Sequence, residues 1–306
     1  RVVPGSPDGD VFAIGFGPRS DLFIDGGPGQ SLCFWSLPDL REIRREDLGG
    51  VRSRGFVAGE RLLTFTDLSR GDRVARVRSW PLPRGEPQLL GQIDSGVSSL
   101  ATDPEGHWLA YGQGRTVRIR GLDGSRPWQE RILGAHPEEV QLVSPFGAQG
   151  FMSVDKSGEI RIWSLDESRR TPLRVLRAPQ SALSLLAADP EGTRIARALP
   201  GAIQVWNLRD PPDAASAVLK RPEMEWDNTG GFDASGRWLI SNNALTVAFW
   251  PVSLPRKRVL PGPVAGWDIA FTPDSRWLVS CPFADAVRVW PLRPADGAVR
   301  ALNPTV

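Results

Sequence analysis

The chain has 306 residues, of which 32 are glycine and 28 are proline. This share is about a fifth against an average of roughly 12%, so frequent tight turns are expected and a helical bundle is disfavoured. A hydrophobic content of 41%, with 12 Trp and 12 Phe, is enough for a large core and excludes a disordered chain. The 37 basic and 35 acidic residues leave a net charge of +2, which argues against a nucleic-acid partner.

Cysteine usage and the start of the sequence bear on the compartment. Cys33 and Cys281 are the two cysteines, too few for a disulfide framework or a four-cysteine zinc site. No apolar run approaches the ~18 residues of a membrane span. We therefore expect a cytoplasmic protein without membrane insertion. The sequence begins with Arg1 and shows no basic-then-apolar leader, so we expect either a processed chain or, in preference, a segment of a longer protein.

A short alternating strand that ends in an aromatic residue recurs seven times. Its anchor positions are Trp35, Trp80, Arg120, Trp163, Trp206, Trp250 and Trp290. The steps between successive anchors are 45, 40, 43, 43, 44 and 40 residues. This is the period of a four-stranded propeller blade, and strict alternation excludes a helical array of similar period.

A four-residue turn, with proline in five of its six copies, lies between the anchors at 17–20, 103–106, 144–147, 189–192, 233–236 and 272–275. Small and branched apolar residues precede most of these turns, as at 97–102 and 267–271, and predict an innermost strand. A second strand follows each turn, as at 107–111 and 276–280. The second repeat is the least regular, with no proline turn and a wide loop at 70–73.

A fourth segment follows each anchor and carries Arg or Lys in six of seven copies. Such charges suit an outer edge strand that must not pair with other chains. The expected fold class is therefore all-β: a single seven-bladed β-propeller of four-stranded antiparallel blades spanning residues 1–306. We expect residues 1–4 to close the ring by pairing with the strand that ends at Trp290, with residues 298–302 as the rival closing strand.

These repeats resemble the WD-repeat (WD40-type) β-propellers over essentially the whole chain. The resemblance rests on the seven-fold period, the turns, and six anchor tryptophans followed by Ser, Pro or Asn where the family most often has Asp. In that family a His, a Ser or Thr, an Asp six residues before the Trp, and the Trp form a hydrogen-bonded network. No anchor here has Asp at that distance. Only the fourth repeat approaches the pattern, with His136, Trp163 and Asp155 displaced by two residues.

The resemblance implies structural roles for a defined set of side chains, namely Trp35, Trp80, Trp163, Trp206, Trp250, Trp290, His136 and Asp155. It also implies a divergent bacterial type, as found C-terminal to signalling kinases or signalling ATPases. Residues near the start of each innermost strand line the rim of the central channel in the family. The variety of types at these positions is typical of a specific docking surface, which predicts Phe12, Arg52, Glu139, Asn228 and Trp267 as partner-binding residues.

The residues offer little for catalysis. His107 and His136 are the two histidines, so a zinc site on nitrogen or sulfur ligands lacks material. No G-x-S-x-G nucleophile elbow is present. The acidic residues of the turns recur at equivalent positions, which favours structural roles. We predict no enzyme activity, no cofactor and no metal.

The favoured function is a non-catalytic interaction or sensor/scaffold propeller. It would present one face of the ring to a protein partner or to another domain of its parent chain, and would be monomeric in isolation. The alternative is an enzyme-type propeller, a hydrolase or lyase, with its active site at the mouth of the central channel. Fold alone does not decide between them.

Overall fold

The structure, a computed structural model, describes residues 2–4, 14–16, 22–27, 31–36, 41–47, 53–58, 60–66, 74–94, 96–103, 105–122, 130–147, 150–166, 168–177, 186–199, 201–211, 217–220, 229–233, 235–242, 246–251, 258–261, 266–272, 274, 277–282 and 286–291. Within these ranges the chain forms strands and turns and no helix. No described segment is therefore a helix long and apolar enough to cross a bilayer. The 28 strands are grouped into four-stranded antiparallel sheets, which we number 1 to 7 in chain order.

The first three sheets contain twelve strands in chain order. Sheet 1 holds β2 (Ile14–Phe16), β3 (Leu22–Gly27), β4 (Ser31–Ser36) and β5 (Arg41–Asp47). Sheet 2 holds β6 (Ser53–Ala58), β7 (Arg61–Thr66), β8 (Val74–Pro81) and β9 (Gln88–Asp94). Sheet 3 holds β10 (Val97–Thr102), β11 (Trp108–Gln113), β12 (Thr116–Gly121) and β13 (Glu130–Ala135).

The remaining sheets continue the same order. Sheet 4 holds β14 (Val140–Phe146), β15 (Gly150–Asp155), β16 (Glu159–Ser164) and β17 (Arg174–Arg177). Sheet 5 holds β18 (Leu186–Ala188), β19 (Arg194–Leu199), β20 (Ala202–Asn207) and β21 (Ala217–Lys220). Sheet 6 holds β22 (Thr229–Phe232), β23 (Trp238–Asn242), β24 (Thr246–Pro251) and β25 (Arg258–Pro261). Sheet 7 holds β26 (Gly266–Phe271), β27 (Trp277–Pro282), β28 (Ala286–Pro291) and β1 (Val2–Pro4).

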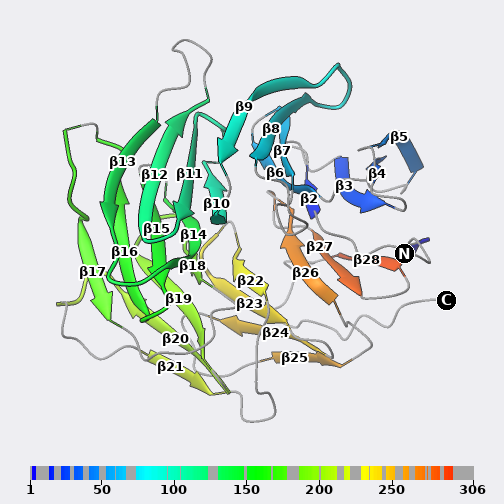
Figure 1. Ribbon diagram of the computed structural model, residues 1–306. Helices are drawn as coiled ribbons and strands as arrows, with labels where there is room; N and C mark the ends of the chain where they lie inside the picture. Colours follow the sequence, from blue (N-terminus) through cyan, green and yellow to red (C-terminus); the bar gives the residue numbers. More distant parts are fainter. Residues whose placement is uncertain are drawn as a thin grey trace.

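The sheets are arranged around a common centre, with their first strands inward and their last strands outward (Figure 1). The first strand of each sheet contacts the first strand of the next, from β2 through β6, β10, β14, β18 and β22 to β26. Strand β26 in turn contacts β2. This is a propeller-like, all-β architecture, as the period of the sequence predicts.

The N-terminal strand completes the last sheet. Val2 pairs with Arg288, Val3 with Val287 and Pro4 with Ala286. The predicted pairing of residues 1–4 with the Trp290 strand is thus confirmed for residues 2–4. The rival segment at 298–302 lies outside the described residues.

Neighbouring sheets are held together by apolar clusters that cross the space between them. Between sheets 3 and 4, Trp108 lies 5.6 Å from Phe151, and Phe151 lies 6.5 Å from Trp163, measured between ring centroids. All three side chains are buried. Similar clusters join sheets 1 and 2, 2 and 3, 4 and 5, and 5 and 6. The anchor tryptophans therefore pack between neighbouring sheets and stabilise their contact.

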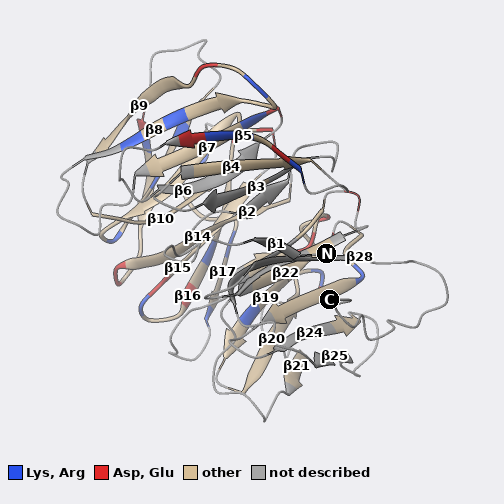
Figure 2. Ribbon diagram, turned by 90° about the vertical axis from the view of Figure 1, so that its right-hand side faces the viewer, with Lys and Arg blue, Asp and Glu red and all other residues tan. Residues whose placement is uncertain are grey.

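Charge is spread over the molecule in both signs. Strand β5 contains both basic and acidic residues (Figure 2), and Arg45 pairs with Glu42 and Arg44 with Glu46. The near-neutral sequence thus corresponds to interspersed charges on this strand, rather than a face of one sign.

Candidate functional site

The loop into sheet 4 and the hairpin beside it contain a connected group of buried polar side chains. Ser153, in the middle of β15, is fully buried and lies between two aromatic side chains. Trp163 Nε1 donates to Ser153 Oγ at 2.8 Å, and His136 Nε2 lies 2.7 Å from the same oxygen. The indole can only donate, so Ser153 Oγ accepts from Trp163. We assign the His136 proton to Nδ1, the nitrogen that faces Asp155, and in this tautomer the Ser153 hydroxyl donates to Nε2.

Asp155 completes this group at the end of β15. Its Oδ2 lies 3.5 Å from His136 Nδ1, longer than a well-formed hydrogen bond, and accepts from the amide of Glu138 at 3.1 Å. Its Oδ1 accepts from Ser157 Oγ and from the amides of Ser157 and Glu159 at 2.6, 2.9 and 3.0 Å. One buried carboxylate therefore fixes both the hairpin and the connection that leads into β14.

The electrostatics of this group follow from its burial. Desolvation, together with the nearby Arg161 charge, lowers the pKa of His136 to about 4 against the opposing effect of Asp155 and Glu159. Burial by itself would raise the pKa of Asp155, but hydrogen bonds from Ser157 and from two backbone amides lower it overall. The histidine is thus neutral and the aspartate ionised at neutral pH.

Two charged side chains lie on the surface above this group. Glu139 and Lys156 form an ion pair and are 58% and 54% exposed. The Lys156 amide donates to the Glu139 carbonyl at 3.0 Å, which joins the two loops through the backbone. Mutual interaction lowers the pKa of Glu139 and raises that of Lys156. We call Glu138, Glu139 and Lys156 the sheet 4 rim. The predicted partner-binding residue Glu139 therefore lies on an exposed surface, where it contacts Lys156 through both side chain and backbone.

The side chains of the other four predicted partner-binding residues lie outside the part of the chain that the structure describes. Phe12, Arg52 and Asn228 lie outside the described residues. Trp267 lies in β26 at a register shift between Gly266 and Asp268, and its side chain is not described. The structure therefore brings together Glu139 with Lys156 and Glu138, and leaves the other four positions as predictions.

The predicted structural tryptophans are buried wherever their side chains are described, namely Trp35, Trp80, Trp163, Trp206 and Trp250. The side chain of Trp290 lies outside the described set. Part of the sheet 4 arrangement recurs in two other sheets. Trp80 Nε1 donates to Thr64 Oγ1 at 2.8 Å, and Trp250 Nε1 donates to Ser241 Oγ at 3.3 Å.

Sheets 3 and 5 have other residue types at the positions equivalent to Ser153 and Trp163 of sheet 4. Arg120 takes the anchor position opposite Leu109, and Tyr111 takes the position of Ser153. Glu130 binds both Tyr111 and Arg120, and the guanidinium lies 5.8 Å from the tyrosine ring centroid. In sheet 5 the position belongs to Arg197, which is fully buried, and desolvation lowers its pKa. Arg120 is a predicted anchor position, whereas Tyr111, Glu130 and Arg197 carry no signal in the repeat.

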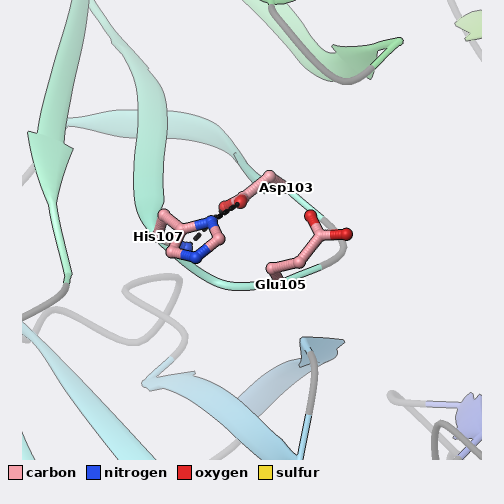
Figure 3. A group of neighbouring side chains, drawn as sticks. All are labelled: Asp103, Glu105 and His107. Atoms are coloured by element: carbon pink, nitrogen blue, oxygen red, sulfur yellow. Dashed lines mark hydrogen bonds and ion pairs between the residues drawn. The ribbon is translucent and has the colours of Figure 1, made fainter.

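One group of side chains has the composition of a metal site. The ligand atoms of Asp103, Glu105 and His107 lie within 4.8 Å of one another on the turn between β10 and β11. Figure 3 shows Asp103 and His107 facing each other, with no interaction drawn to Glu105. Asp103 is buried, whereas Glu105 and His107 are exposed.

The hydrogen bonds of Asp103 identify it as a turn cap. Its Oδ1 accepts from the amides of His107 and Trp108 at 2.7 and 3.1 Å, and its Oδ2 lies 2.7 Å from His107 Nδ1. Asp189 does the same in sheet 5, where Thr193 Oγ1 donates at 2.7 Å in place of the imidazole. Asp233 caps the amide of Trp238 at 2.8 Å in sheet 6. A geometry that recurs without a histidine explains this carboxylate without a metal.

Comparison with known proteins adds one finding about the family. Residues 255–290 match the family WD40 (WD domain, G-beta repeat). A search of curated proteins found no match. The matched segment includes β26 to β28 almost completely and ends at the anchor Trp290. This part of the chain therefore matches a single WD40 repeat.

Proposed function

We propose that the chain is one seven-bladed WD-repeat propeller and that it acts as a non-catalytic protein-interaction scaffold. The cyclic contacts between innermost strands, the pairing of β1 with β28 and the WD40 match at 255–290 support the fold. A rigid ring of packed sheets suits the display of loops from one face. The partner is a protein or another domain of the parent chain, and the resemblance to bacterial signalling propellers motivates a cytoplasmic sensor or scaffold role.

The observation that carries this proposal is the sheet 4 rim. Glu139 and Lys156 are exposed and paired with each other, and buried Asp155 binds the backbone amides of the nearby residues Glu138 and Glu159. Preorganised charged side chains lose little conformational freedom when they bind a partner. We therefore place the partner on the face that carries Glu139, rather than on the opposite face formed by turns such as 189–192.

A photo-crosslinking amino acid at position 139 tests this assignment. In cells that contain the native partner, it should capture the same protein repeatedly, and mass spectrometry identifies that protein. The matched control carries the crosslinker at Glu191, which is 75% exposed on the opposite turn face. Equal capture from both positions, or none from position 139, would reject the proposed face.

A charge swap separates recognition from stability. The double variant Glu139→Lys/Lys156→Glu retains an ion pair, so its thermal midpoint should stay within the range of neutral surface changes. Retention of the crosslinked partner should nevertheless fall strongly, because the pattern of charge is reversed. Unchanged retention would show that the pair is only a surface salt bridge.

A further inference from the structure

The outer strands of sheets 2 to 5 share an exposed aliphatic residue at one register position. The residues are Leu89, Ile132, Val175 and Val218, with exposed fractions of 57%, 52%, 42% and 50%. They lie opposite Arg78, Arg118, Arg161 and Gln204, each two residues before its anchor. Because the exposed aliphatic residue recurs in four sheets, we interpret it as a structural feature of the outer strand and not as a binding site.

Sheet 4 departs from this shared pattern. Leu173, which directly precedes β17 and donates its amide to the Ile162 carbonyl at 2.7 Å, is 49% exposed. It lies two residues before Val175, so both side chains are on the same side of the strand. The corresponding residues are Pro87 in sheet 2 and Glu130 in sheet 3, where the carboxylate is paired with Arg118 and Arg120.

The same side continues with an exposed basic residue. Arg177 follows Val175 by two positions and is exposed. We call Leu173, Val175 and Arg177 the sheet 4 edge row. The other side of β17 faces sheet 5, where Leu176 is buried and Arg174 donates to the carbonyls of Leu208 and Asp210. The edge row lies on the side of β17 that faces sheet 3, where Arg161, opposite Val175, donates to the Ala135 carbonyl. Leu173 and Val175 nevertheless remain 49% and 42% exposed on this side.

The charge around the edge row is positive. The segment 168–177 contains four arginines and no acidic residue. Arg170 and Arg177 are exposed and form no ion pair with any part of the chain that the structure describes. The nearby carboxylate of Asp166 is bound by Ser168, and Arg169 is among the charges that lower its pKa. Glu159, which lies opposite Arg177, is paired with Arg161 at 2.7 Å. The positive charge of Arg170 and Arg177 thus remains available to a partner.

We propose that the edge row binds an extended acidic segment of a protein partner, which adds as a further strand to β17. Strand β17 is the outermost strand of its sheet, and its hydrogen-bonded neighbour is β16. An edge strand offers backbone donors and acceptors to an added strand, and cross-strand side chains give the specificity. Apolar residues of the segment lie beside Leu173 and Val175, and a carboxylate lies beside Arg177. This inference rests on the proposed role as an interaction propeller and names the chemistry of one partner segment.

Fluorescence anisotropy with a labelled peptide tests the edge row. The probe is a short fluorescein peptide in which threonine alternates with valine and glutamate, and its control has lysine in place of glutamate. The acidic peptide should bind and the lysine peptide should not. Leu173→Thr/Val175→Thr and Arg177→Glu should each weaken binding by about tenfold or more, because apolar contact or charge pairing is lost.

The control variants make the same types of substitution in sheets 5 and 6, away from the edge row. Val218→Thr removes the repeating aliphatic residue of sheet 5, and Arg237→Glu reverses an exposed charge in sheet 6. Both should leave affinity within about twofold, since neither position touches the edge row. Equal loss in these controls, equal binding of the two peptides, or no binding by the unaltered chain would overturn the proposal.

Two further outcomes separate this inference from its alternatives. If Arg177→Glu causes self-association in sedimentation without changing peptide affinity, the arginines only protect the edge, and the proposal is wrong. If crosslinking from position 139 succeeds while the edge-row variants bind the peptide normally, the interaction role stands and the edge row is rejected. If the peptide result holds and position 139 captures nothing, the proposed face fails and the edge row stands.

Discussion

Arg174 of sheet 4 donates from Nη1 to the carbonyl oxygen of Leu208 in sheet 5 at 2.6 Å. Its Nη2 also donates to the Asp210 carbonyl at 3.0 Å. Arg131, at the equivalent position of sheet 3, reaches the Leu165 carbonyl of sheet 4 at a longer 3.5 Å. Leu165 and Leu208 each lie two residues after an anchor tryptophan. Part of the arginine excess of this chain thus serves to join neighbouring sheets.

We predict that Arg174→Ala lowers the free energy of unfolding by about 1.5 to 3 kcal/mol, the usual cost of losing hydrogen bonds from a charged group. Arg174→Lys should recover only part of it, because an ammonium group lacks the planar fork that reaches two carbonyls. Urea unfolding measures both variants. Arg209→Ala removes a 75% exposed arginine and should change stability by less than about 1 kcal/mol. Similar losses in Arg174→Ala and Arg209→Ala would contradict the assigned role.

The second prediction concerns pH. Burial lowers the pKa of His136 from 6.5 to about 4, so the unfolded chain binds the proton more readily than the folded chain. Stability should therefore be complete above pH 6.5 and should decline as the pH falls toward 4, by about 3 kcal/mol from this group. The lowered pKa of Asp155 acts in the same direction, with loss as the pH falls further through its folded value.

His136→Gln should flatten this decline between pH 6.5 and 4 in urea unfolding measured at several pH values. His107→Gln is the control, because the His107 side chain is 66% exposed. An unchanged slope in His136→Gln would show that other groups cause the acid sensitivity.

The sequence predicts the repeating parts of the fold well, because turn and anchor residues carry strong local preferences. It does not identify the innermost strands β6 of sheet 2 and β22 of sheet 6. Sheet 2 lacks the proline turn, and β22 contains Gly230 and Gly231, which weaken the alternating apolar pattern. These strands are defined by their pairing with β7 and β23, which involves residues distant from any local pattern.

The network of sheet 4 shows why residue counting misjudges a site. Asp155 is displaced by two positions along the sequence, yet its carboxylate still faces His136. The hairpin between β15 and β16 accommodates the two-residue displacement. Gly158 adopts a φ of +88° there, and Asp155 caps the turn by accepting from the amides of Ser157 and Glu159. The number of residues between two positions does not fix the distance between their side chains, and the hydrogen-bonded network depends on that distance. Ser153, the central hydroxyl, was not singled out from the sequence because serine is common in strands of this kind.

The third prediction compares two buried hydroxyls. Ser153→Ala removes the partner of both Trp163 Nε1 and His136 Nε2, so two buried polar atoms lose a hydrogen bond. The expected loss of unfolding free energy is about 2 to 4 kcal/mol. Thr64→Val removes a hydroxyl that accepts from Trp80 and has no second partner among the residues that the structure describes, and should cost about 1 to 2 kcal/mol. Equal losses in the two variants would show that His136 gains nothing from Ser153.

The last prediction decides between turn cap and metal ligand for Asp103. As a cap, its carboxylate accepts from two backbone amides and lies against His107, so Asp103→Ala should destabilise the protein by about 1 to 2 kcal/mol. Because Asp189 builds the same turn without histidine, adding zinc or manganese should leave the thermal midpoint unchanged, and chelation should have no effect. Glu105→Gln and His107→Gln are the matched variants, since a metal site would need both side chains, whereas the two amide hydrogen bonds of the cap need neither the Glu105 carboxylate nor the His107 imidazole. A rise of the midpoint with zinc that disappears in Glu105→Gln and His107→Gln would establish a metal site and contradict this assignment.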